Sequence, residues 1–276
     1  MKISRRWIRK NLSMVIGIVM LLLIVISSIF APFITSQDPL LVKPALRLQA
    51  SSQEHLFGTD FWGRDILSRV IYGGRSSLVI GLASIGIALI LGVSFGILAG
   101  YYPYAKTTYI IIWITDILMA FPTIILGAFV GIMFGPGLFN TIVAIAIAFI
   151  PRFIRLARGN TLSVKEDIYI VAAKSIGMSD LRIIRIHLLP NIISPVIVMA
   201  AIWTSAAITI EVALSFLGLG VKPPTPSWGT VLQDNLRIFV IQPVAVVWPC
   251  LALAWTVQAL NLIGDRFRDF LDPKMR

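Results

Sequence analysis

Charged side chains are scarce in this sequence of 276 residues, since Asp, Glu, Lys and Arg together make up only 13% of it, against about 25% in a typical soluble domain. The sequence also holds a single cysteine, Cys250, and two histidines, His55 and His187. One cysteine excludes a disulfide within the chain, and two isolated histidines lack the spacing of a metal site. No G-x-x-x-x-G-K-[ST] segment occurs, so the chain has no P-loop for ATP. We therefore expect neither an enzyme by itself nor a bound cofactor.

Apolar residues dominate instead, with 57% of the sequence hydrophobic and a mean hydropathy of +0.88. A helix needs about 20 apolar residues to cross a bilayer. The segments that qualify are 14–33, 77–100, 108–134, 138–153, 192–220 and 244–264. Their apolar runs are continuous rather than alternating, which excludes a β-barrel. The first run is too long for a cleaved signal peptide. The sequence thus predicts an all-α, polytopic membrane protein with about six transmembrane helices, the fourth of which extends past Pro151 as an interfacial helix.

The lysines and arginines behind the net charge of +11 are distributed unevenly. If the N-terminus is cytoplasmic, the inner segments carry five, one, seven and four of them, in all 17 of the 24. These are Lys2, Arg5, Arg6, Arg9, Lys10, Lys106, Arg152, Arg155, Arg158, Lys165, Lys174, Arg182, Arg185, Arg266, Arg268, Lys274 and Arg276. The positive-inside rule then predicts a multi-pass protein of the cytoplasmic membrane with both termini in the cytoplasm. It also favours contact with membrane lipid over contact with nucleic acid.

The predicted spans divide the chain into two parts. Residues 1–76 hold the N-terminal segment, the first span and an outer loop, and residues 77–276 hold the core transmembrane domain with a long inner loop, 152–190. A second outer segment, 221–242, contains three prolines that favour extended backbone. Prolines inside two spans, Pro122 and Pro195, predict kinks.

The inner loop predicts two short helices. Ser163 and Glu166 have the spacing of a capping box, so we expect one helix to begin there and to end at Gly177 in a left-handed conformation. A second helix is expected from Ser179 to Leu189, before Pro190 starts a new helix. The apolar stripe of the first helix is formed by Ile168, Val171, Ala172 and Ile176. It suits either a groove on a soluble partner or the lipid headgroup region.

Several motifs carry a family resemblance. Residues 171–177 (VAAKSIG) and 187–191 (HLLPN) resemble the EAA loop of ABC importer permeases, although Val171 stands where the signature glutamate occurs. Residues 56–69 (LFGTDFWGRDILSR), 214–221 (LSFLGLGV) and 261–273 resemble the dipeptide, oligopeptide and nickel branch of that family.

This resemblance implies the type I ABC importer permease fold and a cargo of peptides, nickel or a metal chelate. It also implies a second homologous permease subunit in a heterodimer, two cytoplasmic ABC ATPase subunits and an extracytoplasmic substrate-binding protein. A coupling helix at about 176–186 is expected to dock on the ATPase. The implied coupling residues are Val171, Ala172, Ala173, Gly177, Met178, Ser179, Asp180, Leu181 and Pro190.

Two sets of charged residues have open interpretations. Asp60, Arg64, Asp65 and Arg69 can form an outer gate or a dock for a binding protein, or can be solvated ion pairs such as Asp65 with Arg69.

The second set is formed by Asp116 and Glu211, which fall inside predicted spans. A carboxylate there is costly, so each should face the bundle interior or a water-filled path. They can line the translocation path, or they can bond a neighbouring helix or the paired subunit. An alternative function is an ion-gradient-driven secondary transporter that uses both carboxylates, which predicts inverted repeats and broken helices. A purely structural membrane scaffold is a third possibility.

Overall fold

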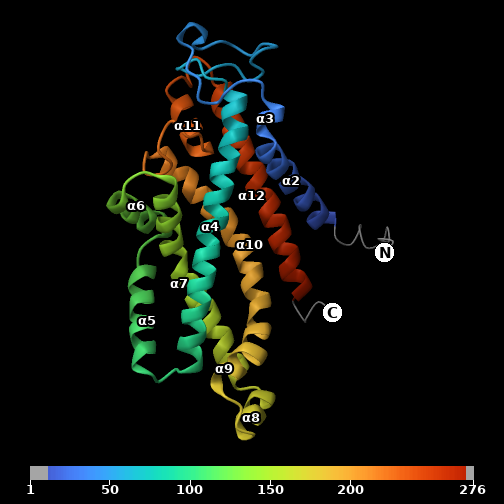
Figure 1. Cartoon of the computed structure of the whole chain (residues 1–276), viewed down its shortest axis with the longest axis vertical. Coiled ribbons are helices and arrows are strands. Elements are labelled where there is room, and N and C mark those ends of the chain that lie inside the picture. The colour runs from blue at the N-terminus through green and yellow to red at the C-terminus, as the bar shows by residue number, and fades with distance from the viewer. Residues whose placement is uncertain (1–11, 272–276) are drawn as a thin grey trace.

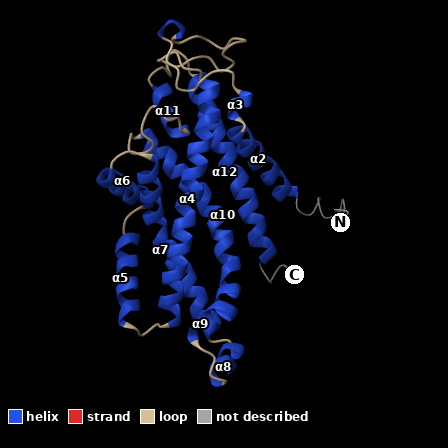
Figure 2. Cartoon of the chain, viewed as in Figure 1, coloured by secondary structure: helices blue, strands red, loops and turns tan. Residues whose placement is uncertain are grey.

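The computed structural model describes residues 12–271, and within them the only β pairing is an isolated bridge between Thr59 and Asp65. The predicted all-α fold is therefore confirmed (Figure 2). The helices are α2 (Leu12–Ile29), α3 (Ala31–Ile34), α4 (Ile66–Tyr101), α5 (Lys106–Met119), α6 (Thr123–Phe134), α7 (Leu138–Lys165), α8 (Ile168–Ser175), α9 (Asp180–Ile183), α10 (Leu189–Phe216), α11 (Trp228–Leu236) and α12 (Val244–Leu271). A 3-10 turn, Pro44–Leu46, and a π-helical turn, Ile184–Leu188, complete the list. The basic positions Lys2, Arg5, Arg6, Arg9, Lys10, Lys274 and Arg276 lie outside the described residues.

About six spans are present, as predicted. Among the described residues, five helices are long and apolar enough to cross a membrane, and α5 with α6 forms a sixth span that is bent by 98°. Pro122 is the N-cap of α6, so the kink predicted at this proline is a complete break between two helices. Pro195, in contrast, lies inside the continuous helix α10.

Helices α4 and α7 are both longer than their apolar runs, so the predicted start of the second span is wrong, whereas the predicted continuation of the fourth span past Pro151 is confirmed. Helix α4 begins at Ile66, so the boundary placed at residue 76 falls inside it and Arg69 is helical. Helix α7 continues through Pro151 to Lys165. An interior proline removes one helical hydrogen bond, and the extensive packing of α7 against α4 outweighs that loss.

The inner loop also differs from its prediction. Ser163 lies inside α7 and Glu166 is the C-cap of that helix, so no capping box forms there. The first short helix, α8, begins at Ile168 after Asp167 as N-cap. The second begins at Asp180 as expected, but it does not stop before Pro190. A π-helical turn at Ile184–Leu188 precedes Pro190 and carries the chain into α10 without a break, as such turns allow inside helices.

Glycines let α4 and α7 approach closely along their length. A Cβ at Gly92 would lie 2.3 Å from the Cβ of Phe153, and one at Gly96 would lie 2.7 Å from the Cβ of Ala157. Gly100 is equally tight. Close packing of small residues is a main source of helix association in lipid. We therefore treat α4 and α7 as one rigid pair.

The long helices run between two ends of different character (Figure 1). One end carries the loop between α3 and α4 together with α11, and the opposite end carries α8 and α9. Helix α2 lies on the outside against α12 and α4. Helix α11 was not predicted, because the prolines of 221–242 favoured extended backbone. Ser227 starts it by accepting a hydrogen bond from the Thr230 amide.

Candidate functional site

Helices α8 and α9 form a short helical hairpin, which we define as residues 166–188 and call the coupling hairpin. Its joint is Gly177, with φ of +79°, a backbone conformation that side chains disfavour. The amide of Gly177 donates to the Lys174 carbonyl at 2.9 Å, and the amide of Met178 donates to the Ala173 carbonyl at 3.1 Å. These bonds cap α8 in the manner of a glycine C-cap. The left-handed helix end predicted at Gly177 is thus present.

The coupling hairpin has one buried and one exposed apolar face. Ala173 is buried and contributes to a small core. The partners of that core are Tyr101, Ile170, Ile183 and Leu188, with Met178 partly buried against it. On the other face, Ile168 is 87% exposed and Ile176 79% exposed. Val171, Ala172 and Leu181 are exposed as well. The predicted apolar stripe therefore lies free at the end of the bundle.

Asp180 fastens the coupling hairpin to the end of α4. Its two carboxylate oxygens accept hydrogen bonds from the hydroxyl of Tyr101 at 2.6 Å and from that of Tyr102 at 2.7 Å. Lys165, at the end of α7, donates to the Tyr101 carbonyl at 2.6 Å, and the ammonium group of Lys174 lies 4.7 Å from the centre of the Tyr101 ring. The hydrogen bond to the Asp180 carboxylate raises the pKa of Tyr102. Asp180 was among the predicted coupling residues, whereas the two tyrosines were not, and their only signal in the sequence was their position directly after a predicted span.

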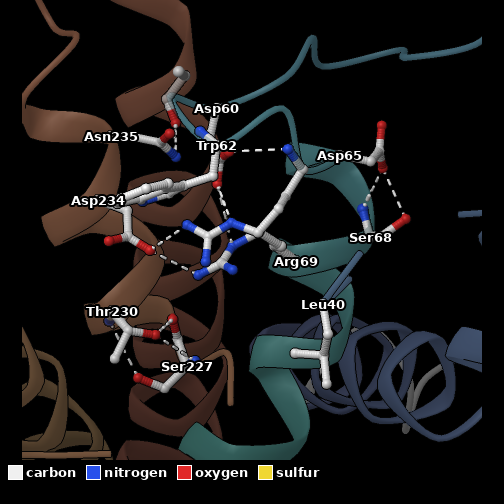
Figure 3. Close-up of polar contacts among 12 residues, drawn as sticks. Leu40, Asp60, Trp62, Asp65, Ser68, Arg69, Ser227, Thr230, Asp234 and Asn235 are labelled. Atoms are coloured by element: carbon white, nitrogen blue, oxygen red, sulfur yellow. Dashed lines mark hydrogen bonds and ion pairs between the residues drawn. The ribbon is translucent and has the colours of Figure 1, made fainter. Parts of the chain in front are cut away.

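At the opposite end, three of the four predicted outer residues, Asp60, Arg64 and Arg69, come together with Asp234 of α11. Figure 3 shows Arg69 beside Asp60 and Asp234. The Arg64 Nε donates to an Asp60 carboxylate oxygen at 2.7 Å. Arg64 and Arg69 each donate to the same Asp234 oxygen, at 2.7 and 2.8 Å. All except Asp234 are buried, with side-chain exposures of 8% or less. The solvated ion pairs considered above are therefore wrong for this cluster.

Asp65 belongs to a different arrangement. Asp65 is the N-cap of α4, and one of its carboxylate oxygens accepts hydrogen bonds from the amide and the hydroxyl of Ser68. The other carboxylate oxygen lies 2.9 Å from His55 Nδ1. The suggested pair with Arg69 does not form. Arg64 of the outer loop and Arg69 of α4 are instead both tied to α11 through Asp234. The buried side chains of Asp60, Arg64 and Arg69 offer little surface to a docking partner, and the gate or dock role stays a prediction.

The two carboxylates inside the spans have opposite surroundings. Glu211 of α10 is fully buried, accepts a hydrogen bond from the Ser215 hydroxyl at 2.8 Å and lies beside Ser77 and Ser227. It exposes no surface to a path, and its setting fits the structural interpretation. Asp116 of α5 is 58% exposed and pairs at 2.9 Å with Arg155 of α7, which is 60% exposed. Asp116 therefore does not face the interior of this chain's own bundle, and the alternative, that it faces a water-filled path, stays a prediction.

The fold and this arrangement define a class, the all-α membrane proteins whose helical hairpin presents a free apolar face at one end of the bundle. The chain is similar in structure to the MetNI methionine ABC transporter in an inward-facing conformation, with a TM-score of 0.62 and 20% sequence identity over 75% of this chain and 98% of that one. The chain belongs to the family of binding-protein-dependent transport system inner membrane components, which it matches over residues 92–276. Residues 1–50 match the N-terminal transmembrane domain of oligopeptide transport permease C.

Three proteins that are similar in sequence align with nearly the whole of this chain. The dipeptide transport system permease protein DppC of Alkalihalophilus pseudofirmus is 41% identical over 98% of this chain and 88% of its own length. The di/tripeptide transport system permease protein DppC of Pseudomonas aeruginosa is 41% identical over 94% of this chain and 88% of its own length. The glutathione transport system permease protein GsiD of Escherichia coli is 42% identical over 99% of this chain and 89% of its own length.

Proposed function

We propose that this chain is one of two membrane-spanning permease subunits of an ABC importer that carries peptides across the cytoplasmic membrane. The family membership supports this, together with relatives whose names specify dipeptide, di/tripeptide and glutathione transport. The single observation that carries the proposal is a match to this family over residues 92–276, which contain the last part of α4, the coupling hairpin and all helices from α5 to α12. Nickel or a metal chelate is the less favoured cargo, since none of these relatives is named for it.

The complex proposed around the chain has a second, homologous permease, two ATPase subunits and an external substrate-binding protein. The free apolar face of the coupling hairpin, with Ile168, Val171 and Ile176, has the pattern of a helix that fits a groove on a soluble partner. We assign that partner as the ATPase. The coupling hairpin lies at the end opposite the outer loops, which agrees with the cytoplasmic location that the distribution of lysines and arginines predicts for it.

The geometry explains how movement of the ATPase can be transmitted to the transmembrane helices of this chain. The coupling hairpin is fastened to α4 through Asp180, and α4 is packed tightly on α7 through its glycines. A displacement of the hairpin therefore moves a rigid helix pair rather than a loose loop. ATP hydrolysis takes place in the other subunits, and this chain converts their motion into alternating access.

An ion-gradient-driven transporter is less well supported. Its broken-helix criterion is met by α5 and α6, but Glu211 is enclosed and the relatives are binding-protein-dependent permeases. A purely structural membrane scaffold would not require a hairpin that is hydrogen-bonded to α4 and presents a free apolar face.

The test is reconstitution of the four-part complex in proteoliposomes with its binding protein. We expect ATP-dependent uptake of a labelled dipeptide that vanadate abolishes. Uptake that follows an ion gradient without ATP would contradict the proposal.

A further inference from the structure

The broken span α5–α6 is held to the rigid α4–α7 pair by two arginines that lie one turn apart on α7. Arg155 donates to Asp116, near the end of α5, at 2.9 Å. Arg152 donates to the hydroxyl of Thr123, the first residue of α6, at 2.5 Å. Each half of the broken span thus has its own arginine, one on either side of the 98° bend.

Asp116 lies within a predicted span. It is ten residues after Lys106, which corresponds to about 15 Å along α5, and about one turn before α5 ends at Met119. Even so, Asp116 and Arg155 are each more than half exposed. A charged pair with this exposure is unstable against lipid tails, so water or another protein must cover it in the membrane.

The surface around the pair is hollow and loosely packed. A hollow of about 500 Å³ lies along α5 beside Asp116, lined also by Tyr109 and Trp113. A second, of about 390 Å³, lies at the bend and is lined by residues 118–123 with Ala148 and Arg152. Helix α5 has only limited contact with α4 and α7, in contrast to the close contact between those two helices.

We propose that the Asp116–Arg155 pair lines the water-filled translocation path and is a releasable latch between α5 and the α4–α7 pair. It holds the inner half of the broken span in the conformation described and separates when the path changes its access. A solvated pair suits this role, because water can replace either partner at little cost. The inference rests on the proposed transport function and assigns to Arg155 a role that the sequence analysis did not consider.

The first experiment measures access of water to Asp116. In a Cys250→Ser chain assembled in the full complex, Asp116→Cys is treated with a positively charged, membrane-impermeant methanethiosulfonate reagent. The control is Leu22→Cys on α2, a site 50% exposed. We expect Asp116→Cys to react at least about tenfold faster, since charged reagents are excluded from lipid. Equal rates would overturn the inference, as would reaction in the isolated chain but protection in the complex in every nucleotide state, which indicates burial against the second permease.

The second experiment tests the pair itself and does not depend on the cysteine variant. Asp116→Asn and Arg155→Gln should each lower dipeptide uptake by about twofold to fivefold, because an exposed ion pair contributes only a small free energy. ATP hydrolysis stimulated by the binding protein should persist, which an unassembled complex could not show. The reversed pair, Asp116→Arg with Arg155→Asp, should recover most of the uptake, and Lys106→Gln on the same helix should match the unsubstituted chain. Wild-type uptake in both single variants would refute the latch alone, whereas a native complex without uptake or ATP hydrolysis would refute the transport function itself.

Discussion

The Asp180 carboxylate accepts a hydrogen bond from the hydroxyl of Tyr101, a residue 79 positions earlier in the chain. This contact joins the short coupling hairpin to the end of the longest helix, α4, which crosses the membrane-spanning region. Because α4 packs tightly against α7, a displacement of the coupling hairpin is transmitted to the centre of the helix bundle. The transport account depends on this mechanical connection.

Removal of the Asp180 carboxylate should uncouple the complex. Asp180→Ala deletes two hydrogen bonds to a charged group, each worth about 1 kcal/mol or less because the carboxylate is exposed to solvent. We expect dipeptide uptake to fall strongly while the protein still inserts and ATP hydrolysis continues. Transport and hydrolysis measured on the same proteoliposomes check this. Glu166→Ala, an exposed carboxylate on the same hairpin, is the control and should transport normally; an equal defect there would argue against a specific role for Asp180.

A side chain at Gly177 should damage the hairpin joint through the backbone alone. No atom lies within 4 Å of a Cβ built at this glycine, so only its φ of +79° opposes substitution. Gly177→Val should cost more than about 1–2 kcal/mol and reduce uptake without loss of membrane insertion. Gly177→Asn should do less harm, because asparagine tolerates left-handed backbone. Gly159→Val in α7 also has open space and is the spatial control. Full transport by Gly177→Val would show that the joint has no part in coupling.

The α4–α7 contact should be intolerant of bulk. Gly96→Leu places a side chain where even a Cβ would lie 2.7 Å from the Ile154 carbonyl oxygen. Overpacking of this kind costs about 1–3 kcal/mol or more, so we expect a lower melting temperature in detergent and poor assembly. Gly86→Leu, in the same helix with nothing within 4 Å of its Cβ, should leave the melting temperature nearly unchanged. Comparable melting of the two variants would count against a rigid pair.

The cluster of Asp60, Arg64, Arg69 and Asp234 is predicted to stabilise the fold rather than to recognise the binding protein. Asp234→Ala removes the shared partner of Arg64 and Arg69. The cost should be lower than the roughly 3–5 kcal/mol of a fully buried pair, because Asp234 is partly exposed and Asp60 remains beside both arginines. The protein should melt at a lower temperature, while the affinity of the binding protein for assembled complex stays within about twofold. Asp38→Ala, an exposed carboxylate in the same outer loop, is the control. A large loss of affinity with unchanged melting would support the docking role instead.

Local sequence signals predicted much of this protein. Continuous apolar runs located the spans, and Gly177 located the hairpin joint because a left-handed residue needs no distant partner. Pro122 likewise marked the break in the third span. Hydropathy could not locate the ends of α4 and α7, because polar residues such as Arg69 and Arg155 continue a helix once another helix or an ion pair supports them.

The missing parts of the sites are all contacts between distant segments. Tyr101 and Tyr102 bond Asp180, Asp234 bonds two arginines from α4 and the loop before it, and Arg155 bonds Asp116. Each depends on helix packing that a single sequence does not reveal. The error for Ser163 has the same origin, since packing of α7 overrides a local capping pattern.

The measurement closest to the central claim is cross-linking of the coupling hairpin to the ATPase. In a Cys250→Ser chain, Ile176→Cys lies on the free apolar face, and a bifunctional thiol reagent is applied to the assembled complex in inverted and in right-side-out membranes. The account predicts a cross-link to an ATPase subunit, with the thiol labelled by impermeant reagent from the cytoplasmic side alone. Labelling of Ile176→Cys from the outside, or an assembled complex in which it meets no ATPase, would contradict the account.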